Sequence, residues 1–178
     1  PVPIQKLIDP RYAKARMESY TPNKASLSSA IRHGVWQESE QTTHYSVIDG
    51  DGMMVALTTT LNSSFGNKWV IPGTGILMNN EMDDFAASTT EANQYGLLGN
   101  TANAIAPGKR MLSSMTPTLV LKDNAPVLIT GSPGGSTIIT TVLQVILNVV
   151  DHGQSLVDAV AAPRVHHQWQ PDVIDFEA

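Results

Sequence analysis

Residues 41–61 read QTTHYSVIDGDGMMVALTTTL. Segments 45–48 and 53–61 are rich in apolar and β-branched residues, which favour strands. Between them, the DGDG run at 49–52 supplies the aspartates and glycines of a tight hairpin turn. This stretch therefore predicts an antiparallel hairpin. It also raises the question of why two adjacent threonines stand directly before the first segment.

The composition limits the class of protein. The chain has 178 residues, of which 42% are hydrophobic and 15% are charged, as expected of a globular domain with its own core. A formal charge of −5, from 11 basic and 16 acidic residues, argues against a nucleic-acid partner. The absence of cysteine excludes disulfides and thiolate catalysis. No signal peptide is visible, and no apolar run reaches the roughly 18 residues that a membrane span needs.

Further segments carry secondary-structure signals. Asp9 and Pro10 suit the start of a short helix over 10–17. A second hairpin is predicted from 118–121 and 127–130. The segment 138–150 predicts a helix that is apolar over much of its circumference, so we expect it to be well buried. Strand pairs together with a buried helix predict packed layers of sheet and helix.

The rest of the chain contains a capping signal and two long irregular stretches. Ser155 with Asp158 resembles a capping box for a last helix that ends near Ala161. Segment 18–41 is polar and lacks periodicity, and we interpret it as a mobile linker. Segment 86–109 is small and polar, and we predict a long loop of the kind that forms lids over functional sites.

The run GSPGGS at 131–136 precedes the apolar helix. One interpretation is an ordinary glycine-rich turn. The other uses the backbone N–H groups of Gly134 and Gly135, which at a helix N-terminus would point at an anion. A phosphate loop would need a following Lys, which is absent, and a dinucleotide fingerprint does not fit. The functional alternative that remains is an oxyanion site for acyl transfer.

Two other runs suggest a ligand. NNEMDDF at 79–85 is a solvated acidic turn, a metal site, or a site that recognises an ammonium group. Its spacing is not that of a calcium loop. His166 and His167 are adjacent, and neighbours in a strand point to opposite faces, so they are not expected to share an ion. We predict no metal site.

Six runs occur in one order: QTTHYS, LNSSFG, NNEMDDF, LSSM, GSPGGS and APRVHHQW. Together they resemble the γ-glutamyltranspeptidase family of N-terminal nucleophile hydrolases. The resemblance identifies residues 42–178 as most of the family's small subunit, truncated at its C-terminus. Residues 1–41 resemble the end of the large subunit and the linker to the cleavage site. The fold it implies is α/β (α+β), a four-layer αββα sandwich that is incomplete in this chain.

The resemblance gives the adjacent threonines a role. Family precursors cut themselves in front of a threonine, which here places the cut between Gln41 and Thr42. Thr42 then becomes both the N-terminus and the nucleophile. A threonine hydroxyl needs a base, and the new α-amine, with a reference pKa of about 7.7–8.0, can take its proton.

Other site residues are implied by the same resemblance. Thr60 orients the nucleophile, and Gly134 and Gly135 form the oxyanion hole. An aromatic residue of the lid loop corresponds to Tyr95. The pocket that holds the glutamyl group corresponds to Asn62, Glu81, Asp84, Ser113 and Ser114. Acidic groups suit an α-ammonium and hydroxyls suit an α-carboxylate.

The implied reaction is γ-glutamyl transfer from glutathione or another γ-glutamyl compound to water or to an amino acid or peptide, without a cofactor. The implied partner is the remainder of the large subunit, which in the family supplies an arginine that this chain does not contain. Family members of bacteria imply a periplasmic or secreted location. We expect this piece alone to be inactive.

Two rival readings stay open. A related acylase would keep the fold and act on a β-lactam side chain or on poly-γ-glutamate. A non-catalytic folded fragment would bind a partner through surfaces that the missing portions cover. NNEMDDF and the LSSM serines favour a free glutamyl α-amino acid, which ranks the transferase first.

Overall fold

The computed structural model describes residues 4–18, 20–25, 42–88, 91, 93, 94, 97, 99–168 and 172–177. The α-helices are α1 (Ile4–Leu7), α2 (Pro10–Met17), α3 (Ile138–Val150) and α4 (Leu156–Ala161). The strands are β1 (Thr42–Ile48), β2 (Met54–Thr60), β3 (Thr118–Lys122), β4 (Ala125–Thr130), β5 (Val165–His166) and β6 (Asp175–Phe176). Short 3-10 helices are η2 (Glu81–Asp84), η3 (Thr101–Asn103) and η4 (Gly135–Thr137).

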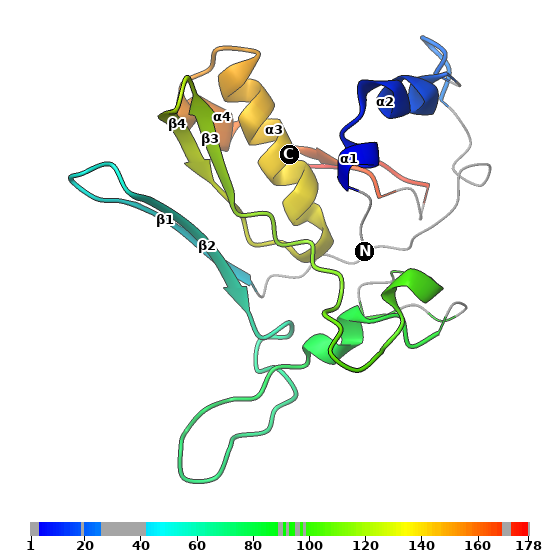
Figure 1. Ribbon diagram of the computed structural model, residues 1–178, viewed down its shortest axis with the longest axis vertical. Coiled ribbons are helices and arrows are strands. Elements are labelled where there is room, and N and C mark those ends of the chain that lie inside the picture. Colours follow the sequence, from blue (N-terminus) through cyan, green and yellow to red (C-terminus); the bar gives the residue numbers. More distant parts are fainter. Residues whose placement is uncertain are drawn as a thin grey trace.

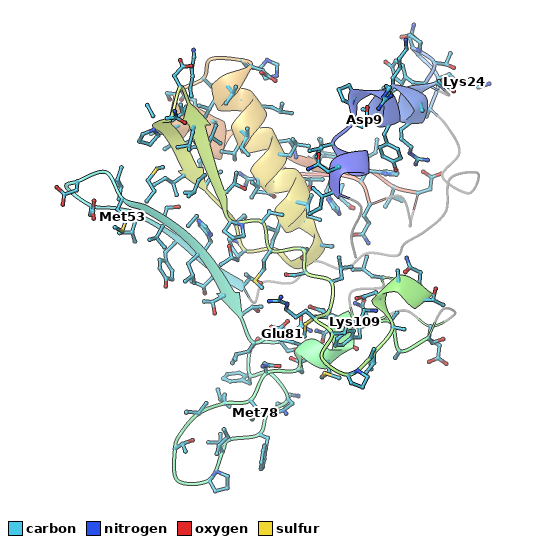
Figure 2. All side chains as sticks on the ribbon, viewed as in Figure 1. Asp9, Lys24, Met53, Met78, Glu81 and Lys109 are labelled. Atoms are coloured by element: carbon cyan, nitrogen blue, oxygen red, sulfur yellow. The ribbon has the colours of Figure 1, made fainter. Side chains whose placement is uncertain are left out.

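The first hairpin confirms the prediction and begins three residues earlier than expected. Strands β1 and β2 pair antiparallel, with Thr42 opposite Thr60 at one end and Ile48 opposite Met54 at the other. The turn is closed at Asp49, whose carboxylate accepts backbone N–H groups from Asp51 at 3.0 Å and Met53 at 2.8 Å. Met53 marks the far tip of the hairpin in Figure 2. The open end of the hairpin therefore carries the threonines.

The second hairpin and the long helix form the centre of the structure. Strands β3 and β4 turn at Asp123 and Asn124, both in the left-handed region with φ of 52° and 62°. Helix α3 lies beside this hairpin, and α4 and the β5–β6 pair contact α3 (Figure 1). The buried apolar side chains of the described residues are Phe85, Leu128, Ile138, Val142, Val145 and Ala159.

Helix α3 is less buried than its sequence predicts. Only Ile138, Val142 and Val145 are buried, whereas Ile139 and Leu143 each keep 51% of their surface exposed. The prediction of a well-buried helix is wrong for this chain, because the described residues cover only one side of α3. The outer side stays apolar and uncovered.

The helix termini follow the predicted signals. Asp9 caps α2 by accepting the Arg11 N–H at 2.8 Å. Ser155 caps α4, accepting the Asp158 N–H at 3.2 Å and donating to the Asp158 carboxylate at 2.6 Å. Both capping predictions are confirmed.

The irregular stretches contain more structure than expected. The acidic run forms η2 rather than a plain turn, and part of segment 86–109 forms η3. All of segment 26–41, including Gln41, lies outside the described residues, as does Tyr95. The linker and lid-residue predictions are therefore untested.

The described strands form three separate two-stranded antiparallel sheets, with β2 in contact with both β3 and β4. The mixed helix and strand content agrees with the predicted class. No helix of the described residues combines the length and apolarity needed to cross a membrane.

Candidate active site

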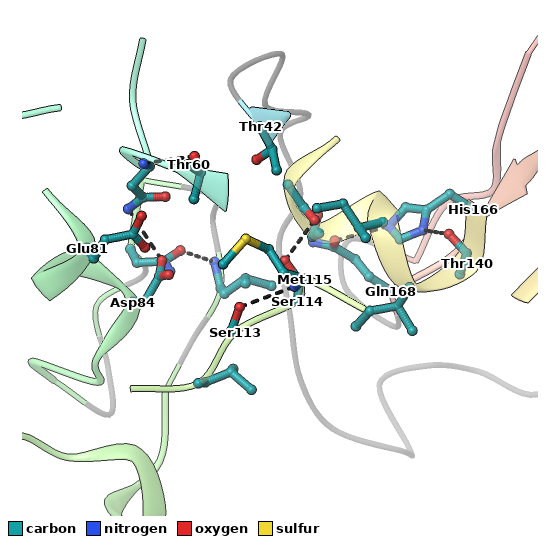
Figure 3. Close-up of a pocket in the computed structure, with 18 of the residues that line it drawn as sticks. Thr42, Thr60, Glu81, Asp84, Ser113, Ser114, Met115, Thr140, His166 and Gln168 are labelled. Carbon is teal, nitrogen blue, oxygen red and sulfur yellow. Dashed lines mark hydrogen bonds between the residues drawn. The ribbon is translucent and has the colours of Figure 1, made fainter. Parts of the chain in front are cut away.

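A cavity of about 310 Å³ opens at the threonine end of the first hairpin. Its walls come from β1, β2 and the residues after it, η2, residues 93 and 97, the 112–115 segment, the glycine-rich turn, α3, and β5 with the residues after it. The lining residues predicted from sequence are Thr42, Thr60, Asn62, Glu81, Asp84, Ser113, Ser114 and Gly135. Figure 3 shows the acidic side chains on one side of Thr42 and His166 on the other. Gly134 adjoins this set without lining the cavity, and Tyr95 and Gln41 lie outside the described residues.

The two cavity threonines face each other across the hairpin. Thr42 and Thr60 are directly opposed in the register, and opposed residues of an antiparallel pair project from the same face with Cβ atoms about 4.5–5.5 Å apart. Thr60 Oγ1 accepts the N–H of Asn62 at 2.9 Å, which fixes its rotamer. Thr43, one residue along, is exposed and does not line the cavity. Thr42 and Thr43 are neighbours of the same residue type, but only Thr42 lines the cavity.

Asn62 links this pair to the acidic wall. It is only 4% exposed and adopts φ of 72°, a left-handed conformation that asparagine tolerates better than most residues. Its side-chain amide donates to the Asn80 carbonyl at 3.3 Å and to the Asp84 carboxylate at 3.4 Å. Asn62 therefore sets the position of Asp84 relative to the end of β2.

Glu81 and Asp84 form a hydrogen-bonded carboxyl pair on η2 (Figure 3). Burial, the charge of Asp84 and the hydrogen bond with Asp84, in that order of importance, together raise the pKa of Glu81 to about 7. Burial also raises the pKa of Asp84, but the hydrogen bond with Glu81 opposes this rise. The shared proton therefore resides on Glu81. A cation that binds beside the two carboxyl groups would displace this proton. The pair therefore suits an ammonium group.

The glycine-rich turn supplies the opposite wall. Gly134 has φ of 129° and Gly135 has φ of 58°, conformations that favour glycine. The turn leads through η4 into α3, and the first N–H groups of such a helical segment have no intrahelical acceptor. Gly135 lines the cavity beside Ser136. The turn can therefore present N–H groups to a developing oxyanion.

Sequence reasoning missed a polar group on the far side of the cavity. His166 is only 8% exposed and lies between Thr140 Oγ1, at 2.7 Å from Nδ1, and the Gln168 side chain, at 3.1 Å from Nε2. His167 instead pairs with Asp172 at 3.3 Å. The adjacent histidines thus have different partners, although both line the cavity. Among the described residues, no cluster of three or more metal-ligating side chains occurs.

The remaining lining residues are apolar or amide side chains to which the sequence analysis gave no role in the site, although Leu112 and Met115 flank the two serines of LSSM. They are Asn93, Leu97, Leu112, Met115, Ile138 and Ile139. A signal for the last two existed in the sequence, since they begin the helix after the glycine-rich turn. The others come from irregular segments whose course the sequence does not define.

The chain is similar to known proteins in sequence and in structure. The family model for Gamma-glutamyltranspeptidase matches residues 1–178. The glutathione hydrolase proenzyme of Escherichia coli (strain K12) is 53% identical over 178 residues, covering 99% of this chain and 31% of that protein. The crystal structure of a mutant Helicobacter pylori gamma-glutamyltranspeptidase has a TM-score of 0.74 and 55% identity, over 76% of this chain and 73% of that chain.

A relative of similar length is also found. The putative inactive glutathione hydrolase 4 of Arabidopsis thaliana is 36% identical over 177 residues, covering 98% of this chain and 92% of that protein. The chain thus spans 31% of the Escherichia coli proenzyme but almost the whole of this plant protein.

Proposed function

The chain belongs to the γ-glutamyltranspeptidase family, and we propose that it carries the threonine nucleophile of an autoprocessed γ-glutamyl transferase and hydrolase. The substrate class is γ-glutamyl compounds such as glutathione. The acceptor is water, an amino acid or a peptide. Cleavage between Gln41 and Thr42 produces the active N-terminus.

The reaction proceeds in two steps. The α-amine of the cleaved Thr42 takes the proton of its own hydroxyl while Oγ1 attacks the carbonyl carbon of the γ-amide. The C–N bond then breaks, the proton passes to the leaving amine, and a γ-glutamyl ester remains on Thr42. Water or an acceptor amine attacks this ester, and the proton returns to Oγ1.

The surrounding groups divide the work. Thr60, opposite Thr42 in the register, orients the nucleophile. The N–H groups of Gly134 and Gly135 stabilise the oxyanion of each tetrahedral intermediate. Glu81 and Asp84 hold the α-ammonium of the glutamyl group. The side-chain amide of Asn62 positions Asp84.

The observation that carries this proposal is the cavity itself. One space of about 310 Å³ is lined by the opposed threonines, the carboxyl pair and the glycine-rich turn. Each of these alone has an ordinary structural explanation. A γ-glutamyl transfer site requires all three within the reach of one small substrate.

The test compares Thr42→Ala with Thr43→Ala in the full-length protein. We expect the wild type and Thr43→Ala to split between Gln41 and Thr42 on incubation at neutral pH and to hydrolyse a γ-glutamyl anilide. Thr42→Ala should remain a single mass and have no activity. Turnover by Thr42→Ala, or loss of both properties in Thr43→Ala, would refute the assignment.

The wider organisation is also proposed. Residues 42–178 belong to the small subunit of a heterodimer, and residues 1–41 belong to the end of its large subunit. The complete fold is the four-layer αββα sandwich, in which further strands extend the two-stranded sheets. The protein acts in the periplasm or is secreted. Detection of the activity in a periplasmic or culture fraction would test the location.

A second candidate is a non-catalytic role for the chain on its own. The similarity to a putative inactive plant protein over nearly its whole length supports it. Incubation of the isolated 178-residue chain tests this second candidate. A stable single mass without anilide hydrolysis is expected of the chain alone, whereas self-cleavage would show that the segments outside it are dispensable for processing.

A further inference from the structure

Asn103, the last residue of η3, hydrogen-bonds two walls of the cavity at once. Its side-chain Nδ2 donates to the Asp84 carbonyl at 2.7 Å, and its side-chain Oδ1 accepts the Leu112 N–H at 2.9 Å. Its backbone carbonyl also accepts the Ala86 N–H at 3.0 Å. Asp84 and Leu112 line the cavity, whereas Asn103 does not. Asn103 therefore links two wall segments without occupying the space between them.

The two linked segments carry the two halves of the proposed α-amino acid site. The Asp84 carbonyl lies at the end of η2, the helix that bears both members of the carboxyl pair. Leu112 directly precedes Ser113 and Ser114, to which the family resemblance gives the α-carboxylate. We call residues 112–115 the serine wall. One side chain thus joins the wall that would hold an ammonium to the wall that would hold a carboxylate.

The spacing between these two walls matters because both ligand groups are attached to the same carbon. A ligand with one fixed distance between its ammonium and its carboxylate needs a site with a matching fixed distance. A shift of one wall by about 1 Å would stretch a hydrogen bond out of its favourable range. Either wall could then still bind its own group, but the two walls could no longer bind one ligand together.

The amide of Asn103 matches the chemistry of its two partners. The Leu112 N–H can only donate and the Asp84 carbonyl can only accept, so the side chain between them must accept at one end and donate at the other. An ionised carboxylate cannot donate, and an alanine side chain can do neither. The two bonds also determine which end of the amide faces each wall.

Lys109 holds the backbone on both sides of Asn103. Its Nζ donates to the Ala102 carbonyl at 2.6 Å and to the Ala104 carbonyl at 2.8 Å. Hydrogen bonds from a charged donor are stronger than those between neutral groups. An ammonium that bridges these two carbonyls therefore limits how far Asn103 can shift.

We infer that Asn103 is a positioning residue that sets the spacing between the carboxyl pair and the serine wall, and that Lys109 keeps Asn103 in place. This inference rests on the proposed function. It adds two residues that act on ligand binding through the walls and not by touching the ligand.

The test uses the full-length processed protein and three competitive inhibitors of γ-glutamyl anilide hydrolysis. L-glutamate carries both α-groups, 4-aminobutanoate lacks the α-carboxylate, and glutarate lacks the α-ammonium. Asn103→Ala should raise the inhibition constant of L-glutamate about tenfold, as expected when a hydrogen-bonded link between the walls is lost. The constants of the other two compounds should rise less than about threefold, because one wall alone binds the α-group of each.

Three further variants make the result specific. Lys109→Met should raise the L-glutamate constant about threefold with the same contrast between ligands, and Lys109→Arg, which keeps a cationic donor, should restore it. Asn100→Ala is the matched control, because Asn100 belongs to the same 3-10 helix and accepts the Ala102 N–H at 2.9 Å but contacts neither wall. It should leave all three constants within about twofold of the wild type. Intact mass and thermal unfolding show whether each variant is processed and folded.

Several results would overturn the inference. One is a folded, processed Asn103→Ala variant that binds L-glutamate like the wild type or loses affinity for all three compounds by the same factor. Another is the same contrast between ligands in Asn100→Ala, which would assign the effect to η3 as a whole. If Asn103→Ala does not fold or is not processed, unchanged L-glutamate binding by Lys109→Met overturns it. A wild type that neither cleaves the anilide nor binds L-glutamate would instead refute the proposed function, and this inference with it.

Discussion

Ligand binding by the carboxyl pair should depend on pH through Glu81. The pKa of Glu81 is raised to about 7, chiefly by burial and then by the charge and hydrogen bond of Asp84. If an α-ammonium binds only the doubly ionised pair, the competent fraction is about one tenth at pH 6 and about nine tenths at pH 8. Because apparent affinity scales with the competent fraction, binding should weaken about tenfold between these values.

The assay measures the inhibition constant of L-glutamate against γ-glutamyl anilide hydrolysis. L-glutamate carries the α-ammonium and α-carboxylate but no scissile amide, and its own ionisation is nearly constant from pH 6 to pH 8. Competition reports binding, so titration of the catalytic α-amine does not enter. The wild-type constant should be about tenfold higher at pH 6 than at pH 8.

Two variants make the result specific. Glu81→Gln removes the titrating group and cannot form the doubly ionised pair, so its inhibition constant should be independent of pH over this range and higher than the wild-type value at pH 6. Asp83→Asn removes one charge from the same 3-10 helix, but Asp83 does not line the cavity, so this variant should keep the wild-type slope. A flat wild-type profile, or an unchanged slope in Glu81→Gln, would show that Glu81 does not control ligand binding.

Three further predictions concern stability. Gly131→Ala should lower the free energy of unfolding, measured by urea titration, by about 2–4 kcal/mol. The new Cβ would overlap the His44 ring and displace that ring from its 2.8 Å bond with Thr58. An effect below about 0.5 kcal/mol would contradict this packing. Since the pKa of Glu81 rises from 4.5 to about 7 on folding, the folded state binds its proton more tightly, and wild-type stability should fall relative to Glu81→Gln as the pH rises through this window. Thermal melts at several pH values measure that difference, and a difference that does not change with pH would contradict it. Ser155→Ala removes the N-cap of α4 and should cost about 1 kcal/mol in the same melts, whereas an unchanged melting temperature would show that α4 does not depend on its cap.

The sequence predicted those elements whose signals are local. Both hairpins depend on their turn residues, α2 and α4 on their N-caps, and α3 on a continuous run of apolar residues. The missed pair β5–β6 is formed instead by residues ten or so positions apart, and beside it Arg164 contacts Glu177 at 2.8 Å. Two-residue strands have no periodicity to read, so only long-range contacts define them.

The burial of α3 could not be predicted for a different reason. The apolar pattern of the helix identifies it as a core element, but it does not say which surfaces cover it. Exposed Ile139, Leu143 and Leu147 lie on the side of α3 that the described residues leave open. Isolated two-stranded sheets are marginally stable in water. The uncovered helix face and the short sheets are thus both consistent with a chain that spans 31% of its Escherichia coli relative.

The candidate site was predicted through motifs and completed by the fold. The motifs identified the threonines, the acidic pair and the glycine-rich turn. These residues extend from Thr42 to Gly135 in sequence but line one cavity. The motifs did not reveal that Ser114 donates to the Gly135 carbonyl, because a hydroxyl's acceptor depends on tertiary packing. They led us to consider His166 only as a metal ligand, a role that we rejected, whereas the structure pairs it with a threonine at 2.7 Å.

The hairpin register decides which threonine can be the nucleophile. Side chains alternate between faces along a strand, so a slip of one residue would turn Thr42 away from the cavity and turn Thr43 towards it. The register is fixed at the other end of the hairpin, where the Asp49 N–H donates to the Met53 carbonyl at 3.1 Å and the Asp49 carboxylate accepts the Met53 N–H at 2.8 Å. From this closed turn the strands pair without a bulge up to Thr42 and Thr60. A turn at the far tip therefore determines which of two adjacent hydroxyls faces the acidic pair and the glycine-rich turn.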